Sequence, residues 1–521
     1  MVRTRHAGLF VPLFSIPSSR SWGIGEIGDI TAFTAWLREA GQDLWQLLPV
    51  NEMAEGQHSP YSALSAMAID PIYLSVGEME DFGALGGEAS LDVSARHDLT
   101  EVRRTLAIDY DTVRALKDAA LRAAFDRFHD VEWAGGSPRA QAFAAFVERE
   151  RWWLDDYALF RVLHARFQQR WWREWEEPLR RRDPGALDRE RREDAREILY
   201  RQYLQWVADD QWQRARAACG VWLFGDFPFM VSGDSADVWV HQDAFDLDAS
   251  VGTPPDEFAA DGQNWGLPAY RWEVMRARDF AWLRERARRG AALFDGYRID
   301  HLVGFYRTYV RPAQGRPSFT PADEADQVAL GEQVLNVLAG SGARIIAEDL
   351  GTVPDFVRAS LARLGVPGYK VLRWERRWHQ PERPFIDPAD YPAASVATTG
   401  THDTDPLAVW WSDLTADDRA KLSELPALRA AGVDWETARF TAAVRDAIIE
   451  LLAASGSDFL ILPIQDVFGW RDRINVPATI TDDNWTWRIL WPVDVLMQEQ
   501  ETRERARTLR EMCQRYGRSN E

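Results

Sequence analysis

Cysteine is scarce in this sequence of 521 residues. Only Cys219 and Cys513 are present, and neither belongs to a C-x-x-C pattern. Two isolated cysteines cannot build the disulfide framework that stabilises small secreted domains. We therefore expect a protein of a reducing compartment, the cytoplasm.

Histidine is also scarce, with nine residues in all, and the spacings H-x-H and H-E-x-x-H do not occur. These spacings are typical of histidine-based metal sites, so we expect no catalytic metal. The absence of a G-x-S-x-G elbow argues against a serine hydrolase, and the absence of a G-x-x-x-x-G-K-[ST] loop argues against a nucleotide-binding protein. We expect the protein to need no cofactor.

Positive charge is in the minority, because 61 lysines and arginines stand against 81 aspartates and glutamates, for a net charge of -20. Nucleic acids and anionic membranes repel such a surface, so we expect neither as a partner. No uncharged apolar run is long enough for a membrane-spanning helix. Basic residues precede an apolar run at the N-terminus, but Pro12 and Pro17 interrupt it and no cleavage pattern follows, so we expect no signal peptide.

Tryptophan, in contrast, is abundant, with 25 residues beside 24 phenylalanines and 13 tyrosines. Aromatic side chains fill large cores, and 46% of the residues are hydrophobic, so most tryptophans are expected in the interior. The flat apolar face of a sugar also stacks on aromatic rings, and the count alone does not separate the two uses.

Seven short apolar runs, separated by amphipathic or polar stretches, indicate parallel strands buried on both faces. They lie at residues 43–50, 222–231, 293–300, 344–350, 369–374, 396–403 and 458–467. Alternation of such strands with helices favours an α/β fold, a (β/α)8 TIM barrel that forms one catalytic domain over residues 1–521. An eighth strand is needed to close the barrel, and we expect it between residues 50 and 222.

The segment of about residues 85–218 differs in composition from the rest of the chain, because it is rich in arginine, glutamate and tryptophan and has few β-branched residues. Leu199, Tyr203, Trp206 and Trp212 recur near helical spacing. We expect a largely helical insertion within the barrel. The last residues, 501–521, are expected to form a surface helix with a frayed end.

Three carboxylates, Asp300, Glu348 and Asp403, lie at the ends of three of the predicted strands. The interval between one carboxylate and the next is long enough for one strand and one helix. Acids at the ends of barrel strands converge on one pocket. Cleavage of a glycosidic bond needs two carboxylates on opposite sides of a sugar. The pattern fits glycosidic-bond chemistry, but by itself it does not separate this interpretation from a structural one.

Each motif taken alone also permits a structural interpretation. Arg298 and Asp300 are two residues apart in a strand and face together, which suits an ionised nucleophile but also a buried ion pair. An acid catalyst needs an apolar site or a neighbouring anion, so that it stays protonated near neutral pH. Alternation from Ile346 places Glu348 on the site face and leaves Asp349 as a helix-start or structural acid.

Seven motifs together resemble one known family. In chain order they are SPYSALSA (59–66), GDFPF (225–229), GQNWGLPAY (262–270), FDGYRIDH (294–301), AEDLG (347–351), THDTD (401–405) and NVPAT…NW (475–485). The chain is similar to the 4-alpha-glucanotransferases called amylomaltases or disproportionating enzymes, glycoside hydrolase family 77 of the α-amylase clan. The resemblance extends from about residue 8 to 495, and G-Q-x-W-G-x-P-x-Y together with R-I-D-H is specific to it.

The resemblance implies a role for each of the three carboxylates. Asp300 would be the nucleophile that forms a covalent glucosyl-enzyme, Glu348 the acid/base, and Asp403 the transition-state stabiliser that holds the distorted sugar. The implied reaction is a retaining cleavage of an α-1,4-glucosidic bond in maltodextrin. The glucanosyl unit would pass to the 4-OH of another glucan or glucose, so maltooligosaccharides would be both donor and acceptor.

The resemblance also assigns substrate-binding roles to seven further residues: Tyr61, Asp226, Trp265, Arg298, His301, His402 and Asn475. Tyr61 would stack on the sugar where the bond breaks, and Arg298 would keep Asp300 ionised. Residues of about 252–270, with Trp265 at their centre, would form a loop over the cleft that excludes water. The alternative for Trp265 is a packed loop anchor.

One segment departs from the pattern of the family. Residues 304–327, GFYRTYVRPAQGRPSFTPADEADQ, lack the tryptophan-containing stretch often found after the nucleophile. This segment would border the acceptor side. Two alternative functions therefore stay open: an α-glucan hydrolase that uses the same carboxylates with water, and a catalytically silent glucan-binding protein.

Overall fold

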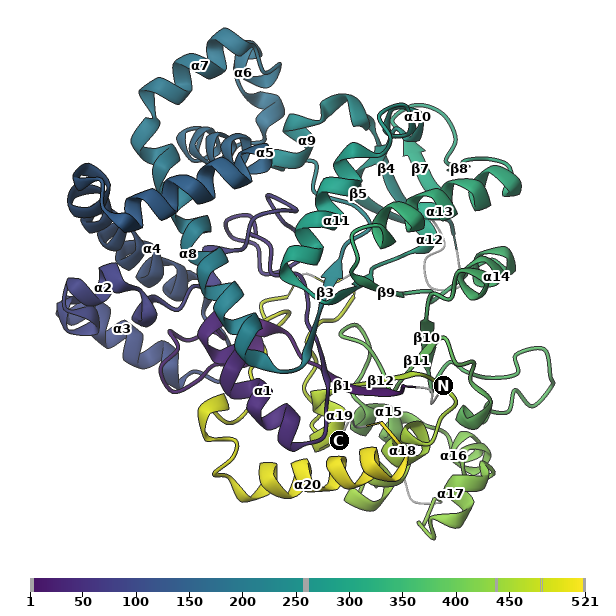
Figure 1. Cartoon of the computed structure of the whole chain (residues 1–521). Helices are drawn as coiled ribbons and strands as arrows, with labels where there is room; N and C mark the ends of the chain where they lie inside the picture. Colours follow the sequence, from purple (N-terminus) through teal and green to yellow (C-terminus); the bar gives the residue numbers. More distant parts are fainter. Residues whose placement is uncertain (1–3, 256–261, 436–438, 478, 480, 519–521) are drawn as a thin grey trace.

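A closed barrel of eight parallel strands forms the centre of the molecule (Figure 1). The structure, a computed structural model, describes residues 4–255, 262–435, 439–477, 479 and 481–518. Around the barrel the strand order is β1-β12-β11-β10-β9-β6-β3-β2. The strands are β1 His6–Phe10, β2 Leu44–Gln46, β3 Trp222–Phe227, β6 Gly296–Ile299, β9 Arg344–Ala347, β10 Gly368–Val371, β11 Ser395–Thr398 and β12 Phe459–Pro463. Each of the seven predicted runs supplies one strand, and the predicted (β/α)8 barrel is confirmed.

The eighth strand is β1, so its predicted place between residues 50 and 222 is wrong. His6 pairs with Phe459 of β12, Gly8 pairs with Leu44 of β2, and all five residues of β1 are buried. The His6 ring contacts Asp43 at 2.7 Å (Nδ1 to Oδ2). The run HAGLF is short and follows basic residues, which is also how a signal peptide begins. Only its pairing with two partner strands identifies it as a barrel strand.

Helices surround the barrel as its outer layer. Those that connect or follow barrel strands include α1 Ile30–Glu39, α8 Ala195–Cys219, α11 Ala281–Leu293, α13 Glu324–Ala339, α14 Asp355–Leu364, α15 Leu407–Asp413, α18 Ala442–Ala453, α19 Ile464–Phe468 and α20 Gln500–Arg515. In α1, Phe33, Trp36 and Leu37 recur at helical spacing and are fully buried. Residues 372–394, between β10 and β11, contain only the short 3-10 helix η9 Pro388–Asp390.

The chain between β2 and β3 is largely helical, at the upper left of Figure 1. Its helices are α2 Glu80–Ala84, α3 Val93–Arg104, α4 Tyr110–Arg127, α5 Pro138–Arg166, α6 Glu177–Arg180, α7 Pro184–Glu193 and α8. Ser137 begins α5 by accepting a hydrogen bond from the N–H of Ala140. Near its end α8 joins the barrel layer, because Trp212 donates its indole N–H to the carbonyl of Leu293 at 2.8 Å.

A small antiparallel sheet lies beside the barrel, at the upper right of Figure 1. Its strands, in the order β5-β4-β7-β8, are β5 Gln263–Tyr270, β4 Phe245–Thr253, β7 Thr308–Pro312 and β8 Ser318–Thr320. The described part of the segment predicted as a covering loop, 252–255 and 262–270, thus lies mostly in the hairpin of β4 and β5. β4 follows barrel strand β3 and β7 follows β6, so the sheet extends from the carboxyl ends of the barrel strands.

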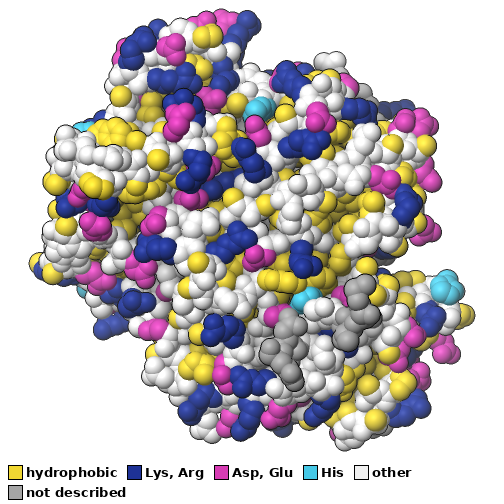
Figure 2. All heavy atoms as spheres, in the orientation of Figure 1, with side chains coloured by type: hydrophobic (Ala, Val, Ile, Leu, Met, Phe, Trp, Pro, Cys, Tyr) yellow, Lys and Arg dark blue, Asp and Glu magenta, His cyan; other side chains and the backbone are white. Residues whose placement is uncertain are grey.

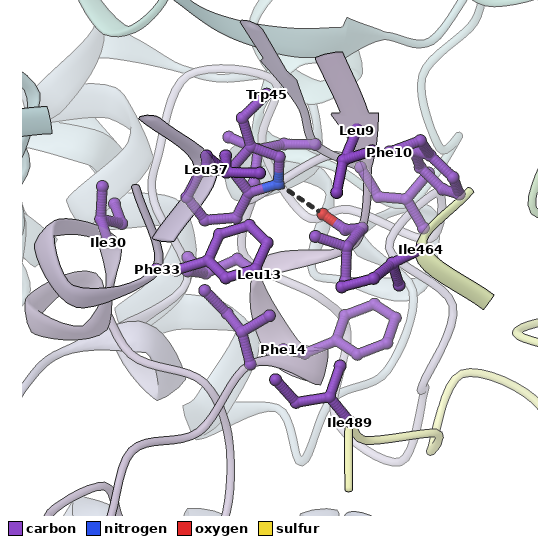
Figure 3. Close-up of a cluster of buried hydrophobic side chains, with 14 of the residues drawn as sticks. Leu9, Phe10, Leu13, Phe14, Ile30, Phe33, Leu37, Trp45, Ile464 and Ile489 are labelled. Carbon is purple, nitrogen blue, oxygen red and sulfur yellow. Dashed lines mark hydrogen bonds between the residues drawn. The ribbon is translucent and has the colours of Figure 1, made fainter. Parts of the chain in front are cut away.

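The hydrophobic core is continuous between the barrel wall and the helices. Leu9 and Phe10 of β1 pack near Phe14, Phe33 and Trp45 (Figure 3), and the Trp45 indole donates to the carbonyl of Val11 at 2.9 Å. The tryptophans differ widely in burial. Fully buried are Trp22, Trp36, Trp45, Trp172, Trp212, Trp239 and Trp411, whereas Trp133, Trp171, Trp374 and Trp378 are exposed.

The predicted C-terminal helix is present as α20. Residues 519–521 lie outside the described residues, and the predicted frayed end is wrong at Arg518. This side chain is fully buried and donates to the carbonyls of Ala453 (2.7 Å), Ser457 (3.0 Å) and His6 (3.3 Å). The contact with His6 places Arg518 beside the start of β1. Buried backbone carbonyls need donors, and Arg518 supplies them at the point where the barrel closes.

Candidate active site

The four acids among the predicted site residues lie at the carboxyl ends of four barrel strands. Asp226 is in β3, Asp300 directly follows β6, Glu348 directly follows β9, and Asp403 lies in the loop after β11. Parallel strands in a barrel all end at the same rim, where the loops that follow them converge. Side chains far apart in the sequence therefore meet in one place.

The buried guanidinium of Arg298 is the centre of the site. One nitrogen, Nη1, donates to Asp226 Oδ2 at 2.6 Å, and the other, Nη2, donates to Asp300 Oδ1 at 2.7 Å. Burial alone would lower the pKa of Arg298, but Asp226 and Asp300 together hold it well above its usual value. The cation is therefore permanent, and it fixes the orientation of the Asp300 carboxylate.

Glu348 faces the same guanidinium from β9. Its Oε2 lies 4.0 Å from Arg298 Nη2 and accepts the backbone N–H of His301 at 2.8 Å, while Oε1 accepts the N–H of Leu350 at 3.0 Å. Asp300 Oδ1 is 2.7 Å from the same nitrogen, so one guanidinium N–H group lies between the two carboxylates. Burial, and then the charge of Asp300, raises the pKa of Glu348 to about 7 against the effect of Arg298.

Asp349, the alternative acid, points to the barrel wall. Its Oδ1 accepts the backbone N–H of Tyr369 at 2.7 Å and thereby ties β9 to β10. Burial raises its pKa to about 6, and the Tyr369 N–H opposes this rise. Among the described residues, its nearest cation is Arg358 at 3.9 Å, on the outer helix α14.

Asp403 is held from both sides. Asn475 donates its amide to Asp403 Oδ1 at 2.6 Å, and His402 Nε2 lies 3.3 Å from Oδ2. Arg473 donates to the backbone carbonyl of Asp403 at 2.8 Å. Burial would raise the pKa of Asp403, but His402 and the amide of Asn475 bring it well below its usual range. Asp403 in turn raises the pKa of His402, which burial alone would lower.

Aromatic rings line the space between these acids. The Tyr61 hydroxyl donates to Asp226 Oδ2 at 2.7 Å, and its ring stacks on His402 with centroids 5.6 Å apart. Trp485 contacts Tyr61 at 6.0 Å and His402 at 5.8 Å between ring centroids. Trp485 closes the motif NVPAT…NW, but the sequence predicted no role for it, because a loop residue has no periodicity that indicates its direction.

Trp265 reaches the site from β5. Its ring meets the His301 ring edge to face, with centroids 4.8 Å apart and planes at 85°. Burial lowers the pKa of His301 to about 4 although Asp300 acts in the other direction, so the imidazole is neutral at neutral pH. His301 has a left-handed backbone (φ 44°), which is strained for a non-glycine residue and is typical of functional sites.

The described residues offer no site for a metal, since no group of three or more His, Cys, Asp and Glu side chains lies together among them. One glycine pattern of nucleotide-binding proteins does occur, GIGEIG at residues 23–28. No strand immediately precedes it, because β1 ends at Phe10, and a side chain on Gly25 would collide with the carbonyl of Leu13 at 1.9 Å. These glycines serve close packing rather than a phosphate site, which requires a strand before the loop.

Comparisons with known proteins identify the family to which the chain is related. The family described as 4-alpha-glucanotransferase, glycoside hydrolase family 77, matches residues 11–493. The 4-alpha-glucanotransferase of Chlamydia pneumoniae is 32% identical over 503 residues, which cover 92% of this chain and 91% of that protein. The 4-alpha-glucanotransferase of Thermus thermophilus is 33% identical over 507 residues, covering 93% and 95%.

Solved structures lead to the same family. The amylomaltase from Streptococcus agalactiae, determined in complex with acarbose, superimposes with a TM-score of 0.82 at 26% sequence identity, covering 99% of this chain and 100% of that one. The match includes the barrel, the helical segment and the side sheet, since it spans nearly all of both chains. This chain belongs to the 4-alpha-glucanotransferase family.

Proposed function

We propose that this 4-alpha-glucanotransferase works by a retaining, metal-independent mechanism on Asp300 and Glu348. The observation that carries the proposal is their shared contact with Arg298 Nη2, at 2.7 Å from Asp300 and 4.0 Å from Glu348. Retaining enzymes place their two carboxyl groups about 5–5.5 Å apart, whereas inverting enzymes need about 6.5–9.5 Å to admit a water. The distance between these two carboxylate oxygens can enter the inverting range only if both oxygens and the nitrogen are nearly collinear. The geometry therefore favours retention.

Asp300 is the proposed nucleophile. Its carboxylate attacks C1 of the donor sugar while the bond from C1 to the leaving oxygen breaks, which forms a covalent glucosyl-enzyme. Arg298 stabilises the anion and aims it, because one of its N–H groups is bound to Asp300 and another to Asp226. Tyr61 completes this arrangement through its hydrogen bond to Asp226.

Glu348 is the proposed acid and base. With a pKa of about 7 it carries a proton in much of the population at neutral pH, so it can protonate the leaving glucan oxygen. In the second step the ionised Glu348 accepts a proton from the 4-OH of the acceptor, whose oxygen attacks C1 and releases Asp300. Formation of the ester removes the charge of Asp300, which lowers the pKa of Glu348 when a base is required.

Asp403 is the proposed stabiliser of the transition state. It stays ionised because His402 and Asn475 bind it, so it presents negative charge beside a sugar that becomes positive as its bond breaks. His402 and Asn475 are fixed by the same contacts and offer further hydrogen bonds to sugar hydroxyls. Tyr61 and Trp485 supply aromatic surface next to this position.

Transfer rather than hydrolysis requires that a glucan hydroxyl reaches the intermediate before water does. Trp265 and His301 lie together over the nucleophile side, and we assign them the exclusion of water and the positioning of the acceptor. The segment 304–327, which departs from the family pattern, contributes β7 and β8 to the sheet that carries Trp265. We therefore place acceptor preference in this sheet.

Maltooligosaccharides and longer α-1,4-glucans are the proposed partners. In the part of the chain that the structure describes, no helix is long and apolar enough to cross a membrane. Acidic and basic side chains are interspersed over the face in Figure 2, which offers no continuous basic surface for a nucleic acid. Cys219 and Cys513 are free and buried, which supports a cytoplasmic location.

Incubation of the purified protein with maltotriose tests the proposal. Longer oligomers and glucose at a constant number of reducing ends indicate transfer. A rising number of reducing ends indicates a hydrolase, and unchanged substrate indicates a protein that only binds. The variant Asp300→Asn must lose transfer, and Asp349→Asn serves as the matched control; retained transfer in D300N would show that the nucleophile is another group.

A further inference from the structure

Two neighbouring loops at the rim of the barrel meet beside Asp403. The Asp403 loop, residues 399–406, follows β11, and the Arg473 loop, residues 469–477, follows α19. The helix after the first loop, α15, lies next to α19 (Figure 1), where a carboxylate of α19 accepts the N–H that begins α15. The two loops therefore start from elements that are already fixed to each other.

Arg473 donates hydrogen bonds to three acceptors on these loops. Its Nη2 binds the backbone carbonyl of Asp403 at 2.8 Å, its Nη1 binds Asp405 Oδ1 at 2.7 Å, and its Nε binds the backbone carbonyl of Asn475 at 3.1 Å. A guanidinium presents its N–H groups in a fixed planar fork, so these contacts set the relative positions of the acceptors. One side chain thereby holds both Asp403 and Asn475, the residue that donates to the Asp403 carboxylate at 2.6 Å.

The Asp403 carboxylate has little packing to fix its direction. Its side chain is 44% exposed, whereas the side chains of Asp226 and Glu348 are 0% and 13% exposed. Hydrogen bonds from the neighbouring loop therefore decide where this carboxylate points. Direction matters here, because a displacement of about 1 Å in a reacting group can cost about 100-fold in rate.

Each loop also has anchors that do not depend on Arg473. In the Asp403 loop, Arg373 donates to the carbonyl of Thr399 at 3.1 Å. In the Arg473 loop, the carbonyl of Ile474 accepts the N–H of Trp485 at 2.8 Å. Replacement of Arg473 should therefore leave both loops folded and change mainly how they meet.

We propose that Arg473 is a positioning residue for the transfer reaction, which sets the direction of the Asp403 carboxylate through the Asp403 carbonyl and through Asn475. The inference rests on the proposed function, because it takes from it the role of Asp403 as the stabiliser of the transition state. In that role Asp403 acts most strongly when positive charge develops on the sugar, so a misdirected carboxylate raises the barrier more than it weakens substrate binding. Loss of Arg473 therefore lowers kcat and leaves KM nearly unchanged.

Arg471 provides a matched control in the same loop. It also donates across to the neighbouring element, to the carbonyl of Ala408 and the hydroxyl of Ser412, both at 3.2 Å. Both acceptors belong to α15 rather than to the catalytic group. The variants Arg471→Gln and Arg473→Gln thus remove the same type of side chain from one loop, and only the second removes a contact with Asp403.

Steady-state transfer from maltotriose tests the inference on the whole protein. R473Q should lower kcat about 10- to 100-fold with a KM within about twofold of the wild type, and R471Q should leave both within about twofold. A loss in R473Q that appears in KM alone overturns the inference. An equal loss of kcat in R471Q overturns it as well, because any link between the loops would then have the same effect.

A double-mutant cycle with Asp403→Ala separates positioning from a general structural role. The residual turnover of D403A can be followed with maltosyl fluoride, an activated donor whose fluoride leaves readily. If Arg473 acts through Asp403, R473Q should cost less than about threefold in the D403A background, since the group that it positions is already gone. The same loss in both backgrounds would show that the two residues act independently, and would overturn the inference.

Asp405→Asn is the second variant, and it replaces R473Q if that protein is unstable. The Asp405 carboxylate binds Arg473 and is 43% exposed, so the substitution keeps the guanidinium and weakens one of its three contacts. D405N should lower kcat about two- to fivefold, and an unchanged kcat would then overturn the inference. Full activity of D403A would instead refute the proposed function, because the assigned stabiliser would not be required.

Discussion

Replacement of Asp300 by asparagine should lower the pKa of Glu348. Both carboxylates approach Arg298 Nη2, Asp300 at 2.7 Å and Glu348 at 4.0 Å. At an effective dielectric constant of about 20, two unit charges about 5.5 Å apart repel by about 3 kcal/mol, or about 2 pKa units. Burial, the largest cause of the raised pKa, is unchanged in the variant. We therefore expect the pKa of Glu348 to fall from about 7 by about 1–2 units.

The titration can be followed by carbon NMR of protein labelled at the glutamate side-chain carboxyl. Glu348→Gln identifies the resonance by its disappearance. Asp349→Asn is the control, because burial, Arg298 and Asp300, rather than Asp349, have the largest effects on the pKa of Glu348. A pKa of Glu348 that stays the same in D300N would refute the reasoning, since the two groups would then not share one pocket. In the wild type, activity should fall as the pH rises through about 7, because the acid loses its proton.

Three further predictions concern groups around the reacting acids. Asn475→Ala should lower kcat/KM about 10- to 150-fold, because it removes a charge-assisted hydrogen bond to Asp403. Asn475→Asp should lower kcat/KM further, because it places a second negative charge beside Asp403. Steady-state kinetics that show no loss would contradict this role of Asn475. As the pH rises from about 4.5 to 7, Glu348→Gln should gain stability relative to the wild type, by up to about 3 kcal/mol. The reason is that the raised pKa makes ionisation of Glu348 unfavourable in the folded protein, and glutamine does not ionise. Urea unfolding of both proteins at pH 5 and pH 8 measures this difference. Arg518→Met should cost about 2–4 kcal/mol in unfolding free energy while transfer from maltotriose persists, and an unchanged urea midpoint would refute its role as a closure of the barrel.

The sequence predicted the barrel well because most of its strands are self-contained apolar runs. LFDGYRID and DFLILPIQDV are long enough to identify a buried strand without knowledge of its neighbours. The run HAGLF of β1 is shorter, and what makes it a strand is its pairing with β12, near the other end of the chain. No local pattern records such a pairing.

The site residues also differ in whether the local sequence could identify them. Asp300, Glu348 and Asp403 could be found from their places at strand ends, since a parallel barrel brings all such ends to one rim. Trp485 could not be assigned a role, because its direction depends on the fold of a loop with a left-handed backbone at that residue (φ 67°). The covering segment around Trp265 forms strands rather than a loop, because β4 pairs with β7, which follows a different barrel strand.

The pairing of β1 with β12 has a consequence for synthesis. Translation at about 5–20 residues per second delivers β12 roughly 20–90 s after β1. Until then the edge of β1 that β12 will cover stays unpaired, and exposed strand edges are where chains associate wrongly. The last turn of the chain arrives later still, and with it Arg518, which donates to the carbonyl of His6. The nascent enzyme therefore remains an open sheet, dependent on protection of its first strand, until almost the whole chain has left the ribosome.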